Sequence, residues 1–211
     1  LPVRNFTEGQ FISMISSKGY IKKTDLMAFA NPRPSGLIAL TIEESDALIG
    51  VSLTNGEQDL LIATRMGQAI RFSEKDVRPM GRTARGVRAI NLKKEGDAVV
   101  GKVIFDDANK EILTVSELGY GKRTSQEEYR TQGRGGSGII NCKLTSRNGH
   151  VISVCSVGND DEIMIITNKG IMIRMPVNQI SSMGRSTQGV RLINMRDGEK
   201  IASIATIVDS N

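Results

Sequence analysis

The chain contains four similar repeats, and each is marked by a pair of glycines. The first glycines of successive pairs lie 48 to 52 residues apart, and the second glycine follows the first by 17, 19, 19 and 19 residues. The pairs are Gly19 and Gly36, Gly67 and Gly86, Gly119 and Gly138, and Gly170 and Gly189. A single unit of this length cannot bury its apolar face, so such repeats pack against one another. The spacing therefore predicts one array that presents equivalent positions along a common edge.

Each repeat carries the pattern of four short strands. In the last copy, strand-like segments cover 162–168, 171–177, 190–196 and 201–208. Asn168-Lys169-Gly170 and Asp197-Gly198 supply hairpin turn chemistry between them. Four strands per repeat are typical of a propeller blade, although the chain has no Trp and hence no WD40 signature. We predict an all-β, propeller-like array of four-stranded blades, forming a single repeat domain over 1–211 with blades near 8–55, 56–107, 108–159 and 160–211.

Charge is segregated by position within the repeat. The formal net charge is only +5, but the windows 19–38, 67–88, 119–140 and 170–191 hold 16 Lys/Arg against 5 Asp/Glu. The rest of the chain holds 12 basic and 18 acidic residues. If equivalent positions share one edge, this pattern predicts a basic band and an opposed acidic one, which is typical of a polyanion binder. The alternative is a solvated surface on which charges cluster by chance.

A glycine-rich loop precedes the third strand of each repeat. The four loops are ANPRPSG (30–36), MGRTARG (80–86), QGRGGSG (132–138) and MGRSTQG (183–189). The last three place an arginine beside a glycine, at Arg82, Arg134 and Arg185. Glycine lets the backbone approach a ligand closely, and arginine offers a fork that matches phosphate. Such loops favour contact with a nucleic-acid backbone, whereas the alternative is that they only turn the chain.

Further basic residues recur at fixed positions beside these loops. One set follows the first turn of each repeat, and another follows the second glycine. The candidate DNA contacts are Lys22, Lys23, Arg71, Arg82, Arg85, Arg88, Lys122, Arg123, Arg134, Arg174, Arg185 and Arg191. Strand pairing would bring the two sets to one face, although the register is not readable from the sequence.

Other chemistries find little support in the sequence. The glycines at 133–138 lack the GK[ST] ending of a P-loop, and no tyrosine has an adjacent general base. The chain has one histidine and two cysteines without metal-ligand spacing, so we predict no catalytic site, no metal and no cofactor. It has no apolar run long enough to cross a membrane, and its N-terminus does not have the pattern of a signal peptide. We therefore expect a cytoplasmic protein with no membrane partner.

Three long segments resemble a known family. RPMGRTARGVRAINL (78–92), GYGKRTSQEEYRTQGRGGSGII (119–140) and MGRSTQGVRLI (183–193) are similar to the C-terminal domain of the A subunit of bacterial DNA gyrase. The resemblance implies a β-pinwheel, in which neighbouring repeats exchange strands. It also implies that the basic outer edge binds and bends duplex DNA, which supports ATP-dependent negative supercoiling by the holoenzyme. The implied partners are double-stranded DNA, the remainder of the A subunit of gyrase and its B subunit, in a heterotetramer at the bacterial nucleoid.

The chain departs from this family in two respects. The family usually has six repeats, and the four found here resemble the last four. The family's signature box, Gln-Arg-Arg-Gly-Gly-Lys/Arg-Gly, belongs to its first repeat. The nearest match is the box-like loop of the third repeat, formed by Gln132, Gly133, Arg134, Gly135, Gly136, Ser137 and Gly138. We therefore expect this chain to be a fragment whose true box lies upstream of Leu1.

Three alternative functions remain open. The equivalent domain in the A subunit of topoisomerase IV has similar blades without a full box and would bind DNA without strong wrapping. A protein-interaction propeller would use the basic band to bind an acidic partner. An enzyme is the third alternative, and the lack of converging titratable residues argues against it.

Overall fold

The computed structural model describes residues 1–207, which form short strands joined by turns, loops and 3₁₀ helices. The first repeat contains β1 (Phe11–Ser16), β2 (Tyr20–Asp25), η1 (Leu26–Phe29) and β3 (Leu48–Thr54). The second contains β4 (Asp59–Thr64), β5 (Gln68–Ser73), η2 (Glu74–Asp76), β6 (Val87–Arg88) and β7 (Val99–Phe105). The third contains β8 (Glu111–Ser116), β9 (Tyr120–Ser125), η3 (Gln126–Glu128), β10 (Ile139–Ile140) and β11 (Val151–Val157). The fourth contains β12 (Glu162–Thr167), β13 (Met172–Pro176), η4 (Val177–Gln179), β14 (Val190–Arg191) and β15 (Ile201–Ile207).

Neighbouring repeats exchange strands. The sheets have the orders β3-β1-β2-β6, β10-β5-β4-β7, β11-β8-β9-β14 and β13-β12-β15. In the first three sheets, three strands come from one repeat and the short fourth strand comes from the next repeat. We call β6, β10 and β14 the exchanged strands. This topology confirms the predicted propeller-like array and the strand exchange implied by the resemblance.

The third-strand predictions need correction. The segment expected over 190–196 is a strand only at Val190–Arg191, because only these two residues find partners, on β9. Since β14 and β15 lie in different sheets, Asp197-Gly198 forms a turn but not a hairpin. In the first repeat, the four-strand pattern would make 36–42 the third strand. This segment is not a strand, since none of the sheets described over residues 1–207 pairs with it.

The exchanged strands begin at glycines that lie very close to the sheet they join. A Cβ on Gly138 would lie 2.3 Å from the carbonyl oxygen of Ala69 on β5. Gly86 and Gly189 would bring a Cβ to 2.5 and 2.7 Å from the carbonyl oxygens of Ile21 and Gly121. All three have positive φ, between 72° and 103°. Glycine is required here because any side chain would collide with the neighbouring backbone.

Most of the hydrophobic core lies between blades, and one small cluster, of Ile12, Met14 and Leu26, lies within the first repeat. One cluster joins Ile15 and Ile21 of the first repeat to Ile62 and Phe72 of the second. Two further clusters connect the second sheet to the third and the third to the fourth. Burial of aliphatic side chains drives this packing. Each blade therefore depends on its neighbour for a core, as the repeat length predicted.

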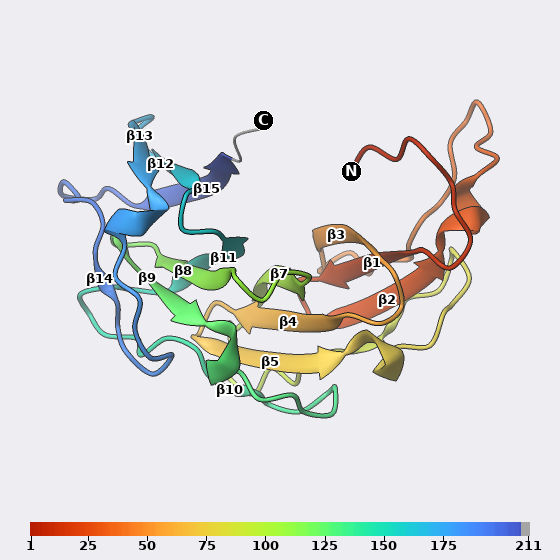
Figure 1. Cartoon of the computed structure of the whole chain (residues 1–211), viewed down its shortest axis with the longest axis horizontal. Helices are drawn as coiled ribbons and strands as arrows, with labels where there is room; N and C mark the ends of the chain where they lie inside the picture. The colour runs from red at the N-terminus through yellow and green to blue at the C-terminus, as the bar shows by residue number, and fades with distance from the viewer. Residues whose placement is uncertain (208–211) are drawn as a thin grey trace.

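The four sheets follow one another in an open arc (Figure 1). β3, β7, β11 and β15 form its inner side, where each contacts the next in order. The N-terminus and β15 lie on opposite sides of the opening (Figure 1). The opposite, outer side is formed by β2, β5 and β9, each paired with its exchanged strand. We call this edge the outer rim, and it carries the candidate site.

Candidate nucleic-acid interface

Two arginines on the outer rim are held by tyrosines across the strand. Arg88 of β6 pairs with Tyr20 of β2, and Arg191 of β14 pairs with Tyr120 of β9. Arg88 Nη2 donates to the Tyr20 hydroxyl at 3.0 Å, and Arg191 Nη2 donates to the Tyr120 hydroxyl at 3.1 Å. Both guanidinium groups also lie over the partner ring, 5.1 and 5.6 Å from its centroid. Both arginines are exposed, so each cation is oriented while it faces solvent.

The middle sheet lacks this arrangement. At the equivalent place, Gln68 of β5 pairs with Ile140 of β10, which is exposed. Arg85 adds a second cation in the first sheet, where its guanidinium lies 4.1 Å from the centroid of the Tyr20 ring. Arg85 also forms an ion pair with Glu43 at 2.6 Å. The tyrosine–arginine pair therefore occurs in the first and third sheets, separated by one blade.

The arginines of the Gly–Arg loops (80–86, 132–138 and 183–189) connect consecutive repeats. Arg134 donates through Nε to the carbonyl of Asp76 at 2.8 Å and through Nη1 to that of Arg88 at 3.1 Å. Arg185 makes the equivalent bonds to Glu128 and Ile140, at 3.0 and 2.9 Å. The bond from Arg134 to the backbone of Arg88 brings these two positively charged residues together on the rim. Arg82 instead lines an open cavity of about 530 Å³ with Arg33 and Gly36.

The box-like loop lies against the exchanged strand of the second repeat. Gly135, with φ of +81°, donates its backbone N–H to the carbonyl of Ala89 at 2.7 Å. Gly136 accepts from the backbone N–H of Asn91 at 2.8 Å. Gln132 is tied to β5 through a backbone hydrogen bond to Arg71. The loop is thus fixed at both ends, with Gly133 and Arg134 exposed between them.

A second group of predicted contacts forms ion pairs within its own blade. Arg71, Arg123 and Arg174 each pair with an acid at the start of the preceding strand, which lies 12 residues earlier in the sequence. The acids are Asp59, Glu111 and Glu162. In the first repeat this acidic position is Phe11, and Lys23 lies 4.9 Å from the centroid of its ring. The constant spacing of arginine and acid is a sequence signal that distinguishes these residues from free rim cations.

Three residues of this group also bind the following repeat. Lys23 Nζ donates to the carbonyl of Glu74 at 2.8 Å. Arg71 Nη1 donates to that of Tyr129 at 3.1 Å, and Arg123 Nε donates to that of Ile180 at 2.7 Å. Their side chains are therefore engaged in holding successive blades together. They do not belong to the set of rim cations that face solvent.

Lys22 and Lys122 are fully buried. Burial lowers the pKa of each to about 8, and a nearby arginine adds to the effect. Their ammonium groups contact loop carbonyls rather than solvent. The structure therefore places these two predicted contacts beneath the rim and not on it.

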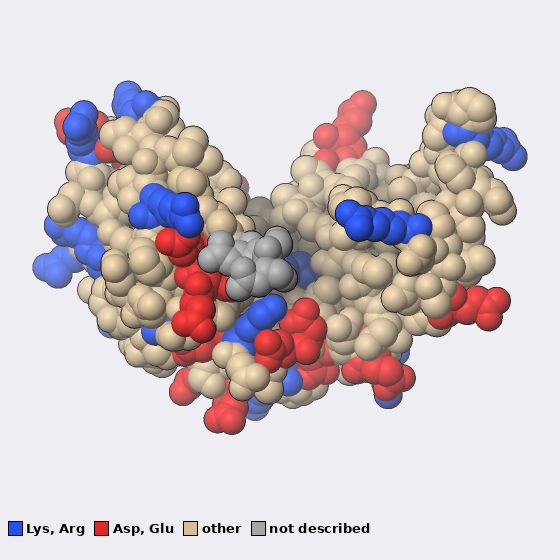
Figure 2. Space-filling view, turned by 45° about the horizontal axis from the view of Figure 1, so that its top comes forward, with Lys and Arg blue, Asp and Glu red and all other residues tan. Residues whose placement is uncertain are grey.

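The predicted contacts that remain on the rim are Arg82, Arg85, Arg88, Arg134, Arg185 and Arg191. Of these, Arg85 is ion-paired with Glu43, and Arg134 and Arg185 also donate to carbonyls of the preceding repeat. Figure 2 shows that basic side chains on the face turned toward the viewer form separated groups, with acidic and uncharged surface between them. Some of the basic residues that the charge pattern singled out are instead ion-paired with acids of their own blade. Because Arg71 and Arg123 are ion-paired and Lys22 and Lys122 are buried, the rim presents discrete cationic points instead of an unbroken band.

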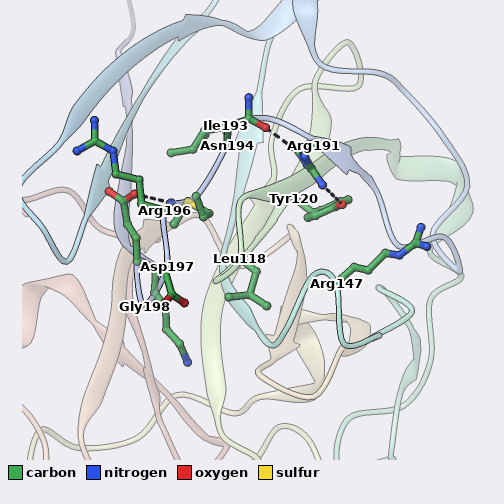
Figure 3. Close-up of a pocket in the computed structure, with 12 residues that line it drawn as sticks. Leu118, Tyr120, Arg147, Arg191, Ile193, Asn194, Arg196, Asp197 and Gly198 are labelled. Atoms are coloured by element: carbon green, nitrogen blue, oxygen red, sulfur yellow. Dashed lines mark hydrogen bonds between the residues drawn. The ribbon is translucent and has the colours of Figure 1, made fainter.

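An open groove of about 410 Å³ lies beside Tyr120 and Arg191. Arg191 is held between the Tyr120 hydroxyl and Asn194, whose Oδ1 accepts from Nη1 at 3.1 Å (Figure 3). Arg147 and Arg196 lie on opposite sides of the groove (Figure 3). The sequence pattern did not single out these two arginines, because they follow the repeat windows in which basic residues concentrate.

Two findings bear on other kinds of site. Over residues 1–207, no group of three or more His, Cys, Asp or Glu side chains is placed to hold a metal ion. In the same part of the chain, no helix has the length and apolar character needed to cross a membrane.

Comparison with known proteins identifies relatives of this arrangement. The family model described as the DNA gyrase C-terminal domain, a β-propeller, matches residues 10–55, 58–101, 110–155 and 161–207. Each match begins just before the first strand of one repeat and reaches into its last strand or past it. The four-fold match agrees with the four repeats seen in the sequence.

Two curated relatives are DNA gyrase A subunits. The one from Haloquadratum walsbyi is 43% identical over 199 residues, which cover 94% of this chain and 23% of that protein. The one from Salmonella typhimurium is 42% identical over 209 residues, which cover 99% of this chain and 24% of that protein. The chain thus spans about a quarter of the length of these relatives.

Solved structures share the fold. A C-terminal domain of DNA topoisomerase IV superposes with a TM-score of 0.91 at 24% identity, covering 98% of this chain and 64% of that one. A DNA gyrase A C-terminal domain superposes with a TM-score of 0.86 at 23% identity, covering 98% and 68%. At these identities the likeness concerns the fold.

Proposed function

The chain belongs to the family of DNA gyrase C-terminal domains, and on this premise we propose that it binds duplex DNA along its outer rim. The observation that carries the proposal is the arrangement of rim arginines. Consecutive repeats place Arg88, Arg134 and Arg185 on adjoining segments of that edge, linked by hydrogen bonds from one loop to the exchanged strand before it. Cations that lie one after another along an arc suit a ligand with regularly spaced negative charges.

The chemistry of these points favours phosphate over base edges. A guanidinium offers five N–H donors in a planar fork, and Arg88 uses one nitrogen for the Tyr20 hydroxyl. The remaining donors stay available for phosphate oxygens. Contacts to phosphate position a protein on DNA without reading its sequence. We therefore expect binding that depends weakly on sequence and strongly on salt.

An arc of such contacts would favour bent DNA. Bending a duplex of 20–30 base pairs costs on the order of 1–6 kcal/mol. A curved row of arginines offsets this cost only if several of them are engaged at once. Bending or wrapping is therefore expected to require more than one blade.

The wider function follows from the family. We propose that the chain serves a gyrase in which DNA bent around this domain supports ATP-dependent negative supercoiling. In that assembly its partners are the rest of the A subunit of gyrase and the B subunit, at the bacterial nucleoid in the cytoplasm. Catalysis is assigned to parts of the holoenzyme outside this chain.

A second candidate is the equivalent domain of topoisomerase IV. The topoisomerase IV domain shares the fold at a TM-score of 0.91, whereas the two gyrase A relatives, at 42 and 43% identity, favour gyrase. The two functions differ in how strongly the DNA is wrapped. Measuring the DNA length that saturates binding separates them, because a wrapped duplex engages more of the arc.

The experiment that tests the proposal compares salt dependence between variants. Binding of the chain to unrelated duplexes of several lengths is titrated across salt concentrations. The double variant Arg88→Glu, Arg191→Glu should weaken binding to all sequences alike. Because each phosphate contact contributes about 0.9 to the slope of log affinity against log salt, the slope should fall by about 2.

A matched control removes positive charge elsewhere. Lys75→Glu, Lys169→Glu makes the same change of net charge at two exposed lysines outside the rim set. This control should change affinity much less than the rim variant. Equal affinities for the rim variant and the unmodified chain, with both folded, would refute the proposed surface. Preference for an acidic protein over DNA at matched salt would support the interaction propeller instead.

A further inference from the structure

We propose that Lys22 and Lys122 act as internal cations around which Gly–Arg loops fold, so that they position Arg82 and Arg185 on the outer rim. Lys22 lies on β2 and Lys122 lies on β9, each beneath the Gly–Arg loop of the following repeat. Their role is distinct from that of the rim cations, because they are fully buried. Only the consequence for DNA rests on the proposed function.

The contacts of Lys122 enclose its ammonium group. Nζ donates to the carbonyl of Gly184 at 2.9 Å, to that of Arg185, and to the Thr187 hydroxyl at 3.3 Å. The loop closes on itself as well, since the Thr187 hydroxyl donates to the Gly184 carbonyl at 2.8 Å. The three N–H groups of the ammonium therefore have three acceptors within one turn of chain.

Lys22 does the same in the first sheet. Its Nζ donates to the carbonyl of Ala39 at 2.6 Å and to the carbonyl of Arg82. The loop turns at the same place, with the backbone N–H of Ala84 donating to the carbonyl of Gly81 at 3.1 Å. In both cases one acceptor is the carbonyl of the arginine that reaches the rim. The lysine thus anchors the backbone from which that side chain departs.

The middle sheet solves the same problem without a cation. Ile70 of β5 occupies the position equivalent to the two lysines, and the loop above it is the box-like loop. Gly135 adopts a positive φ there, and a Cβ on Gly136 would lie 3.5 Å from Ile70 Cδ1. The glycines let this loop settle directly on an apolar side chain. The chain therefore pairs lysine with the loops GRTA and GRST, and isoleucine with the loop GRGG.

The energetics explain why a buried lysine would hold its loop so firmly. A buried ammonium is costly unless all its donors are satisfied, and removing an acceptor leaves a charge stranded in the interior. Opening the loop over Lys122 would remove all three acceptors together. The lowered pKa of both lysines records the cost of burying the ammonium, which these acceptors offset only in part. Opening the loop therefore gives up three hydrogen bonds to a charged donor, and this loss is what disfavours it.

The test replaces the lysine-centred arrangement of the third sheet with the isoleucine–glycine arrangement of the middle sheet. Lys122→Ile removes the cation, and the triple variant Lys122→Ile, Ser186→Gly, Thr187→Gly rebuilds the isoleucine–glycine pair of the middle sheet. Trypsin cleavage after Arg185 reports loop opening, and cleavage after Arg134 in the same chain is the internal control. Cleavage tracks the population of the open loop, so the single variant should be cut after Arg185 about tenfold faster.

The triple variant should return this rate toward that of the unmodified chain, while cleavage after Arg134 stays constant throughout. An unchanged rate after Arg185 in Lys122→Ile overturns the proposal, and so does a triple variant cut as fast as the single one. If Lys122→Ile does not fold, Lys122→Met keeps the length of the side chain and serves the same comparison.

Duplex binding is then measured for the same variants. Lys122→Ile should weaken binding severalfold more than Lys75→Ile, which removes one exposed charge, and the triple variant should recover. If the loop opens and affinity does not change, the positioning of Arg185 for DNA is refuted. If the unmodified chain does not bind DNA, the proposed function fails while the trypsin result still decides the role of Lys122.

Discussion

Two glycines allow the strand exchange to be tested against a matched control. Gly138 precedes the exchanged strand β10, and Gly36 occupies the equivalent place in the first repeat. Their φ angles are similar, +72° and +79°. A Cβ on Gly138 would lie 2.3 Å from the carbonyl oxygen of Ala69, whereas a Cβ on Gly36 would meet nothing within 4 Å. Alanine at the two sites therefore differs only in the collision.

The structure gives the size of the expected difference. Left-handed backbone costs a residue with a Cβ about 1–2 kcal/mol, and the stiffer unfolded chain returns about 0.4–1 kcal/mol. Gly36→Ala should thus lower the free energy of unfolding by about 1 kcal/mol. Gly138→Ala carries the same term and must also push β10 away from β5. Losing their backbone hydrogen bonds and the packing of Ile139 adds about 2–4 kcal/mol.

Urea unfolding of the two variants, followed by circular dichroism, measures this difference. Because domains of this kind have a total stability of about 5–15 kcal/mol, the larger loss is readily seen as a shift of the midpoint. Free energies of unfolding that agree within about 1 kcal/mol would contradict the reasoning, because the collision would then have been relieved at little cost.

Three further changes have defined outcomes. Burial lowers the pKa of Lys102, which donates to the Ser13 carbonyl, to about 7 from an ordinary value of 10.5. The unfolded chain then binds more protons between these values, so stability should rise with pH there, by up to about 1.4 kcal/mol per unit. Lys102→Met should flatten this slope in urea titrations at pH 7, 8 and 9, and parallel profiles would argue against it. Tyr20→Phe removes the acceptor of Arg88 but keeps the ring, and should weaken duplex affinity less than Tyr20→Ala does; equal losses would mean that the ring has no role. Glu74 is buried, accepts hydrogen bonds from two backbone N–H groups and lies 3.9 Å from Lys23. In the same urea assay, Glu74→Leu should lower the free energy of unfolding by about 3 kcal/mol, and Glu74→Gln should lower it by less. A larger loss for Glu74→Gln would show that these hydrogen bonds do not stabilise the fold.

Local sequence patterns predicted the strands but not all of their partners. The hairpins β1–β2, β4–β5, β8–β9 and β12–β13 follow from apolar segments around glycine turns. The fourth segment of each repeat returns to pair with the first strand, for instance β15 with β12. The third segment joins a different sheet, and alternation along Val190–Arg191 carries no information about which sheet that is. Pairing between repeats is decided by packing at long range, and only the resemblance indicated it.

The rim was predicted in outline and misjudged in detail. Charge segregation indicated which part of each repeat carries basic residues, but it did not separate Lys22, which is buried, from Arg88, which is exposed. Neighbouring residues on a strand face opposite sides, so Lys22 and Lys23 cannot both point outward. The acid placed 12 residues before Arg71 would have marked that arginine as part of an ion pair. Tyrosine opposite arginine across the exchanged strand became visible only with the register.

The exchange of strands also means that structural units overlap along the chain. The first sheet is built from residues between 11 and 88, the second from residues between 59 and 140, and the third from residues between 111 and 191. If the chain is cut between two consecutive repeats, the two pieces remain joined by backbone hydrogen bonds, because the later piece still supplies a strand to the last sheet of the earlier piece. A nick between β7 and β8, for example, would separate β10 from β5 along the chain, while β10 would stay paired with β5 in the second sheet. Each of the first three blades is completed by a strand from the next repeat. The gain or loss of one repeat in evolution would therefore also add or remove a strand of the preceding blade.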